Sequence, residues 1–339
     1  MTNSSNFDSL LSQMKEAVST ANDSRRLLNE PAPTVRSPLP GAGDNQSALI
    51  QELMSGVEQR YGIRPGTLVE RKLGRILQDM PIATLRDWVR SLNNCSAEHS
   101  DWQSLVENLT VHETYFCRDA ELLAMVQNDI LPTLIAQRAR TQQLRVWSAA
   151  CSSGEEAYDL AYLCLQGLVK AGKARQTLDQ SIVAAPGWMV WVLGTDVSNQ
   201  ALRTAREAIY GDLGMGSFRN LPAAWKAMFE TVQLPPDNAL AGVQYLKVRN
   251  WIGELVRFER FNLINSRPPV QGVDLVFCRN VLIYFEDEVK QAVQRMLAKA
   301  IAPGGVLIMG ASVQLFAREY FEQRNGPGGP WYLRNEVPA

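Results

Sequence analysis

The sequence predicts an α/β protein with a parallel sheet, preceded by a region made only of helices. Three observations lead to this prediction. Apolar runs rich in β-forming residues alternate with helical patterns after residue 143, no β pattern occurs between residues 46 and 109, and small or polar residues follow the predicted strands. Strands that alternate with helices form parallel sheets, and ligands bind such sheets at the carboxyl ends of the strands.

The composition argues against several classes of function. The chain has 339 residues, and its 34 basic and 35 acidic residues give a net charge of −1, so no overall field favours nucleic acid or an anionic membrane. The five cysteines show no CxxC spacing and the two histidines form no zinc pattern, which predicts no metal and reduced thiols in a cytoplasmic protein. No signal peptide is visible, and the most apolar window, residues 182–193, is too short to cross a bilayer.

Residues 1–45 are rich in Ser, Asn and Pro, which predicts a disordered lead. Residues 46–109 then show four apolar stripes at helical spacing, which predict a small helical domain. The second stripe, near residues 68–77, carries Arg71, Lys72 and Arg75 on its other side. This basic side is either a docking face for an acidic partner or an ordinary solvated helix surface.

The stretch 144–160, LRVWSAACSSGEEAYDL, predicts a buried strand, a tight turn of small residues and a helix. Gly154 lies at the turn, and Glu155 and Glu156 fall in the first helical turn, where carboxylates suit the helix dipole. This order is typical of the first unit of a nucleotide-type site, although an ordinary strand–helix turn remains the alternative. The acidic residues argue against a phosphate ligand.

The later strands also end in polar residues. A strand at 189–193 leads to Asp196, at the place where doubly wound folds hold ribose hydroxyls, although Asp196 could instead cap the next helix. Residues 211–257 interrupt the pattern and predict an antiparallel insert. Strands at 255–261, 273–278 and 306–309 follow, the first ending in Asn262 and Leu263 and the second in Arg279 and Asn280, and the tail at 331–335 predicts an edge strand.

In these segments the chain resembles the chemotaxis-receptor methyltransferases, which methylate glutamate side chains of chemoreceptors with S-adenosylmethionine (SAM). The resemblance spans residues 47–332 and rests on seven segments in order. They are the basic helix, LTVHETYFCRD, VWSAACSSGEEAYDLA, GTDVSNQALRTAREAIY, VRFERFNLI, VDLVFCRNVLIYF and APGGVLIMGAS. It implies a Rossmann-like SAM-dependent methyltransferase domain at 110–339, a small antiparallel insert and an N-terminal helical domain.

The resemblance also implies roles for individual residues. His112, Thr114 and Arg118 reach the cofactor and the methyl-transfer region, and Glu156 lies by the SAM-binding turn. Asp196 holds the ribose, Asn262 and Leu263 flank the adenine, Arg279 and Asn280 border the methionine end, and Tyr284 lines the cleft. The implied product is S-adenosylhomocysteine. The implied partner is the methylation region of a chemoreceptor, which contacts Arg71, Lys72, Arg75 and the insert. The protein is expected to be a monomer.

Methyl transfer to a carboxylate needs alignment rather than a general base, because a glutamate with a pKa of about 4.3 is already an anion near neutrality. We expect Arg118 to orient that carboxylate, unless it is a structural bridge to Asp119 or Glu113. The family commonly has Asn at His112, Phe at Cys117, and a Gly-His-Ser-Glu run where residues 310–313 read GASV. These departures keep two alternatives open: a SAM-binding regulator with little or no activity, and a methyltransferase for another acceptor.

Overall fold

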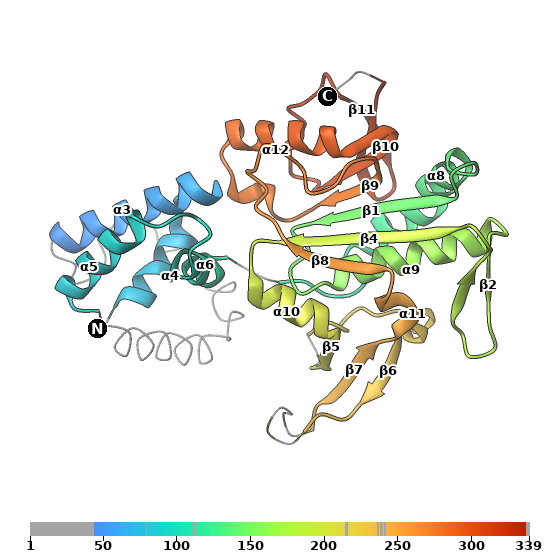
Figure 1. Ribbon diagram of the computed structural model, residues 1–339, viewed down its shortest axis with the longest axis horizontal. Helices are drawn as coiled ribbons and strands as arrows, with labels where there is room; N and C mark the ends of the chain where they lie inside the picture. The colour runs from blue at the N-terminus through green and yellow to red at the C-terminus, as the bar shows by residue number, and fades with distance from the viewer. Residues whose placement is uncertain are drawn as a thin grey trace. The chain divides into compact units, whose positions relative to one another are not determined.

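The computed structural model describes residues 44–78, 80–110, 113–213, 216–235, 237, 240 and 242–336 (Figure 1). The chain divides into two compact units between residues 111 and 112. The predicted disordered lead lies outside the described residues, except for its last two, Asp44 and Asn45, which begin a helix. None of the described helices is both long enough and apolar enough to cross a membrane.

The described part of the first unit is helical. Its four predicted stripes correspond to α3 (Asp44–Tyr61), α4 (Thr67–Leu77), α5 (Ile82–Asn93) and α6 (Ser100–Leu109). Trp102 is fully buried and donates a hydrogen bond from Nε1 to the Leu92 carbonyl at 2.8 Å, which ties α6 to α5. The basic side of α4 is not uniform. Arg71 and Arg75 are exposed, whereas Lys72 is half-buried, donates to the Thr110 carbonyl at 2.7 Å and has its pKa lowered by burial.

The second unit has a seven-stranded sheet in the order β11-β12-β10-β9-β1-β4-β8. Its five successive strands from β10 to β8 are parallel, and β12 and β11 continue the sheet in antiparallel pairing. The strands are β1 (Gln143–Ala149), β4 (Met189–Asp196), β8 (Val256–Arg260), β9 (Val273–Cys278), β10 (Ile301–Met309), β11 (Phe321–Gly326) and β12 (Gly329–Arg334). The predicted α/β fold with a parallel sheet is confirmed.

Alternate side chains of the strands build the core. Leu144 and Val146 of β1 and Val190 and Val192 of β4 join one buried cluster with α7 (Ala120–Met125), the π-helical turn η1 (Val126–Ile130), α8 (Leu131–Gln137) and α9 (Glu155–Lys170). Helix α10 (Asn199–Glu207) packs against β8, and α12 (Asp287–Ala300) packs against β10. These helices cover the sheet and hold its strand ends in fixed register.

The predicted antiparallel insert is a three-stranded sheet in the order β5-β7-β6. Its elements are β5 (Ile209–Asp212), the 3₁₀ turn η2 (Ala223–Met228), β6 (Phe229–Val232) and β7 (Gln244–Val248), and α11 (Asn250–Gly253) leads back to β8. Tyr210, Phe218 and Phe229 surround the fully buried ring of Phe116, with ring centroids 4.8–5.4 Å from it. The insert is thereby packed against the segment that precedes α7.

One interpretation of the sequence was wrong. The tail at 331–335 was predicted as the edge strand, but it belongs to β12, which lies between β10 and β11. The edge is β11, whose sequence FEQRNG has polar, exposed residues at four successive positions and therefore lacks the alternation that predicts a strand. The polar loop after α9 contains a hairpin of β2 (Ala174–Gln176) and β3 (Ile182–Ala184), each only three residues long.

Candidate functional site

The order of the strands locates a candidate site. After β1, the chain adds β4 and β8 on one side of it, and then β9 and β10 on the other side. The strand order therefore reverses between the neighbouring strands β1 and β9. Ligands of doubly wound sheets bind at such a switch point, outside the carboxyl ends of the strands. In Figure 1 the arrowheads of β1, β4 and β8 point toward the same edge, which carries the candidate residues.

Glu156 and Arg279 bridge this switch point. Glu156 follows β1 in the first turn of α9, and Arg279 follows β9. Arg279 donates from Nη1 to Glu156 Oε2 at 3.1 Å, and Ser148 donates from Oγ to Glu156 Oε1 at 2.7 Å. The Arg279 guanidinium also pairs with the carboxylate of Asp119, so it is shared between two carboxylates. Because its side chain is only 4% exposed, this ion-pair network fixes the geometry between β1 and β9.

The first turn is tied to Asp196 by backbone donors. Asp196 is 6% exposed, and its two carboxylate oxygens each accept a hydrogen bond at 2.9 Å, Oδ2 from the Ser152 N–H and Oδ1 from the Ser198 N–H. Ser152 has φ +50° and Gly154 has φ +95°, and this left-handed turn presents the Ser152 amide to the carboxylate. The cap of α10 is Ser198, whose hydroxyl accepts from the Ala201 N–H at 3.0 Å. The alternative that Asp196 caps that helix is therefore wrong.

This arrangement suits a ligand with hydroxyl groups. An ionised carboxylate has about four acceptor positions, and backbone donors use two of those of Asp196. The Ser152 hydroxyl oxygen is buried and has no hydrogen-bond partner among the described residues. Buried polar atoms normally have partners, so an unpaired hydroxyl beside a half-used carboxylate is consistent with a bound polyol such as ribose.

Asn262 and Leu263 lie next to Asp196. The Phe261 N–H donates to the Asp196 carbonyl at 2.9 Å, which brings the chain after β8 against the end of β4. Asn262 Oδ1 accepts from the Ile264 N–H at 3.3 Å, and Leu263 is buried. Asn280, with φ +58°, follows Arg279 and is exposed. The chain segment that carries Asn262 and the buried Leu263 thus lies against the end of β4.

Arg118 lies in the segment before α7 and has an unexpected partner. Its Nη1 donates to the Glu113 carbonyl at 2.7 Å, and within the described residues it forms no ion pair. The alternative of a structural bridge to Glu113 is met through the Glu113 backbone carbonyl, whereas the carboxylates of Asp119 and Glu113 pair with Arg279 and Arg219. Thr114 is half-buried in the same segment, and His112 lies outside the described residues.

Tyr284 is close enough to Arg118 for the two to interact electrostatically. It ends the 3₁₀ turn η4 (Leu282–Tyr284), which follows β9. Burial raises the pKa of the Tyr284 phenol, the positive charge of Arg118 lowers it, and the negative charge of Glu113 raises it again. The net effect is an upward shift, so the phenol keeps its proton at neutral pH and can donate a hydrogen bond.

Two further carboxylates of α9 are buried below this segment. Glu155 accepts hydrogen bonds at 2.8 Å from the hydroxyls of Ser153 and Ser217, and burial raises its pKa. Asp159 Oδ2 accepts from the Cys117 N–H at 2.7 Å, whereas Oδ1 is buried without a partner among the described residues. Burial raises the pKa of Asp159 well above its usual value. Asp159 thus anchors the backbone directly before Arg118.

Sequence reasoning missed several residues at this edge. They are Ser148, Ser152, Asp119, Asp159 and Arg219. A signal existed for Ser148, which is a polar residue in the apolar second half of β1, and for Asp159, which is an acidic residue among the apolar positions of α9. Asp119 and Arg219 gave no such signal, because each lies in a polar segment where any charged residue is expected at the surface.

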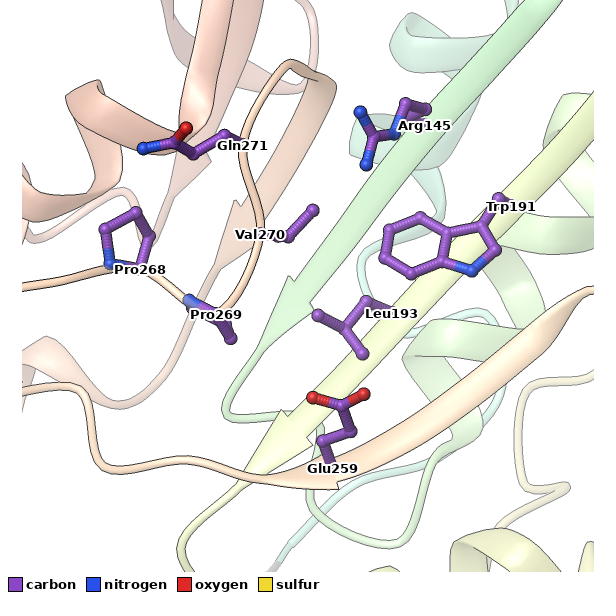
Figure 2. Close-up of a pocket in the computed structure, with 8 residues that line it drawn as sticks. All are labelled: Arg145, Trp191, Leu193, Glu259, Pro268, Pro269, Val270 and Gln271. Carbon is purple, nitrogen blue, oxygen red and sulfur yellow. The ribbon is translucent and has the colours of Figure 1, made fainter.

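A separate groove of about 520 Å³ lies on one face of the sheet (Figure 2). Trp191 and Leu193 of β4 form part of its wall, Arg145 and Glu259 come from β1 and β8, and the loop 268–271 lies opposite. None of the predicted site residues lines it. Within the described residues there is also no cluster of three or more His, Cys, Asp or Glu side chains that could hold a metal ion.

The fold is that of a doubly wound protein, a class that binds nucleoside-containing ligands at the switch point of its sheet. The chain belongs to the CheR methyltransferase family, whose SAM-binding domain matches residues 112–329. A chemotaxis protein methyltransferase of Pseudomonas aeruginosa is 31% identical over 275 residues, which cover 80% of this chain and 84% of that protein. A second, from Vibrio parahaemolyticus, is 30% identical over 252 residues, which cover 73% and 81%. The Escherichia coli chemotaxis protein methyltransferase is 29% identical over 263 residues, which cover 76% and 80%. The chain is a SAM-dependent methyltransferase.

Proposed function

We propose that the chain transfers a methyl group from SAM to glutamate side chains of chemoreceptors, giving glutamyl methyl esters and S-adenosylhomocysteine. The family and the names of its relatives support the reaction type and its place in chemotaxis. The observation that carries the acceptor is Arg118. This guanidinium interacts electrostatically with Tyr284 and, within the described residues, forms no ion pair with a carboxylate.

The residues of the carboxyl edge fit the cofactor. Asp196 has acceptor positions left for the ribose hydroxyls, and Asn262 and Leu263 flank the adenine. Glu156 and Arg279 hold the methionine end, with the remaining contacts from Thr114, Asn280 and His112. When bound, SAM supplies an electrophilic methyl group on a sulfonium. The protein therefore has to bind SAM and the acceptor, align the two and exclude water. This reaction needs neither a metal nor a general base.

Arg118 and Tyr284 act on the acceptor. The planar fork of Arg118 can hold both oxygens of a glutamate and so fix the direction of attack, which a lysine with a single point charge cannot do. Tyr284, protonated because burial raises its pKa, forms a wall of the cleft and donates a hydrogen bond from its hydroxyl. Alignment of this kind contributes up to several kcal/mol to the lowering of a two-reactant barrier.

The acceptor segment is acidic and helical in this proposal, and the exposed Arg71 and Arg75 of α4 contact it together with the antiparallel insert. Lys72 has a different part, since it is bonded to the Thr110 carbonyl. Reversing the charge of Arg71 and Arg75 should lower receptor methylation without changing SAM affinity, whereas Lys72→Glu should mainly destabilise the helical unit. The chain acts in the cytoplasm as a monomer, which light scattering of the purified protein tests.

The decisive experiment incubates the protein with tritiated SAM and membranes that contain the native receptors. We expect base-labile methyl ester on receptor glutamates, and we expect Arg118→Lys to lose most of this signal. SAM binding without any ester would favour the SAM-binding regulator that the GASV run and Cys117 suggest. Label on a different molecule would favour another acceptor. If calorimetry detects no SAM binding, the proposal is wrong.

A further inference from the structure

Arg219 is a second arginine close to the proposed acceptor position. It lies in the insert between β5 and η2, and its guanidinium is 3.7 Å from the centre of the Tyr115 ring. The Arg118 guanidinium is 5.7 Å from the same ring. Because both distances are measured to one ring, the two guanidinium groups lie within about 10 Å of each other, as two cation–π contacts on one aromatic side chain require.

The segment on which both arginines converge is firmly held. The Phe116 N–H donates to the Ser217 carbonyl at 2.8 Å, and the Phe116 ring is buried in the aromatic cluster of the insert. On the α9 side, the Cys117 N–H is bonded to Asp159. Tyr115 therefore stands on a fixed backbone, and the distance between Arg118 and Arg219 is set by the fold rather than by loop motion.

Glu113 occupies the carboxylate position beside Arg219. Arg219 Nη2 donates to Glu113 Oε1 at 2.8 Å, and the Arg219 side chain is 16% exposed whereas that of Glu113 is 49% exposed. The stacked cation is thus held in place, while its carboxylate partner is a half-exposed side chain. Because Glu113 is half-exposed, a carboxylate from a bound acidic segment can take its place, and Arg219 then exchanges one carboxylate partner for another.

We propose that Arg219 is a specificity-determining residue of the acceptor site, and that Glu113 occupies it until an acidic acceptor segment arrives. This inference rests on the proposed function. Arg118 takes the glutamate that is methylated, and Arg219 takes a second carboxylate of the same segment. The upper limit of about 10 Å between the two guanidinium groups accommodates two acidic side chains one helical turn apart, whose Cβ atoms are separated by about 5–6 Å. An acceptor with a single carboxylate would be a poor substrate.

The alternative is that Arg219 and Glu113 form a fixed strut that supports the Arg118 segment. The two possibilities predict opposite changes in the KM for the acceptor when Glu113 is replaced. If Glu113 competes with the acceptor, Glu113→Gln lowers the KM for the acceptor, whereas Arg219→Gln raises it. If the pair is a strut, both substitutions break the same support and change activity in the same direction.

The experiment measures methylation of a purified acidic receptor fragment at low salt, with SAM saturating. We expect Arg219→Gln to raise the acceptor KM by about 10- to 100-fold, the range for one lost hydrogen-bonded charge, with kcat and SAM affinity nearly unchanged. We expect Glu113→Gln to lower the KM by about 1.5- to 5-fold, and to have no effect in the Arg219→Gln background. Arg219→Lys, which keeps the charge, should restore part of the affinity.

Equal losses in both single variants, or an unchanged KM in Arg219→Gln, would overturn the inference. If Arg219→Gln does not fold, as judged by circular dichroism, Arg219→Lys and Glu113→Gln still give opposite signs under the proposal and the same sign for a strut. Should the wild-type protein bind SAM but methylate nothing, the proposed function fails separately. The same comparison is then made on the affinity for the acidic fragment in the presence of S-adenosylhomocysteine.

Discussion

Replacing Asp196 by asparagine tests the cofactor site with the smallest change in shape. In the wild type, each carboxylate oxygen accepts a backbone N–H, from Ser152 and from Ser198. Asparagine keeps one accepting oxygen and turns the other position into an NH₂ group, which then faces an N–H donor. The substitution removes a negative charge and an acceptor from a side chain that is only 6% exposed.

The expected loss of SAM affinity follows from hydrogen bonds. A hydrogen bond to a charged group contributes about 1.5–3 kcal/mol, so losing one bond from a ribose hydroxyl to Asp196 should raise the Kd of SAM by about 10- to 150-fold. The variant should also be less stable by about 1–3 kcal/mol, because one buried N–H of the turn is left without an acceptor. Calorimetric titration gives the Kd, and a thermal melt gives the stability.

Asp274 provides a matched control in the same sheet. It is 2% exposed, and it accepts hydrogen bonds from the Arg145 N–H at 2.8 Å and from the Arg138 guanidinium. It lies near the amino end of β9, about 13 Å along the strand from the edge that carries Arg279. Asp274→Asn should lower the stability and leave the Kd of SAM unchanged. A Kd within threefold of wild type in Asp196→Asn, or equal weakening in both variants, would refute the assignment of Asp196.

Three further predictions concern stability. Arg279→Ala should cost about 3 kcal/mol in urea unfolding, because it leaves Glu156, which is 17% exposed, without its cation. Gly154→Ala should cost about 2–4 kcal/mol in a thermal melt, because φ is +95° and the new Cβ would lie 2.8 Å from a neighbouring alanine Cβ, whereas Gly172→Ala, with φ +67° in open space, should cost only about 1–2 kcal/mol. Burial raises the pKa of Asp159, so the contribution of this group to stability is full below its unfolded pKa near 3.8 and is lost as pH rises toward the folded pKa. Asp159→Asn cannot ionise and so avoids that loss. The melting temperature of the variant minus that of the wild type should therefore increase from pH 4 to pH 8, which calorimetry at several pH values checks.

The parallel sheet could be predicted because its signal is local. The strands ending at Asp196 and Cys278 are apolar runs whose boundaries are marked by polar residues, and a buried parallel strand has to be apolar on both faces. Edge strand β11 could not be predicted in this way, since only its first residue, Phe321, is buried. Its stability comes from pairing with β12, which is a contact that no local pattern encodes.

The same distinction applies to the candidate site. Asp196 could be proposed because it ends strand β4, and Glu156 because it lies in the first turn of the helix that follows β1; the parallel strands all end at one edge. The pairing of Asp119 with Arg279, 160 residues later, depends on how the segment before α7 crosses the sheet. The contact between Arg219 and Tyr115 likewise depends on the fold of the insert. Sequence reasoning reaches residues fixed by the sheet and misses those brought in by long connections.

The two arginines at the edge show why charge balance, rather than residue type, assigns their roles. Arg279 is buried and shared between the carboxylates of Asp119 and Glu156, so an acceptor carboxylate arriving there would meet net negative charge. Arg118 donates to a carbonyl, which carries no net charge, so its positive charge is not neutralised by a carboxylate of the described residues. A negatively charged nucleophile is therefore attracted to Arg118 and repelled from the Arg279 network. In the proposed function, this difference separates the acceptor side of the edge from the cofactor side before any ligand is bound.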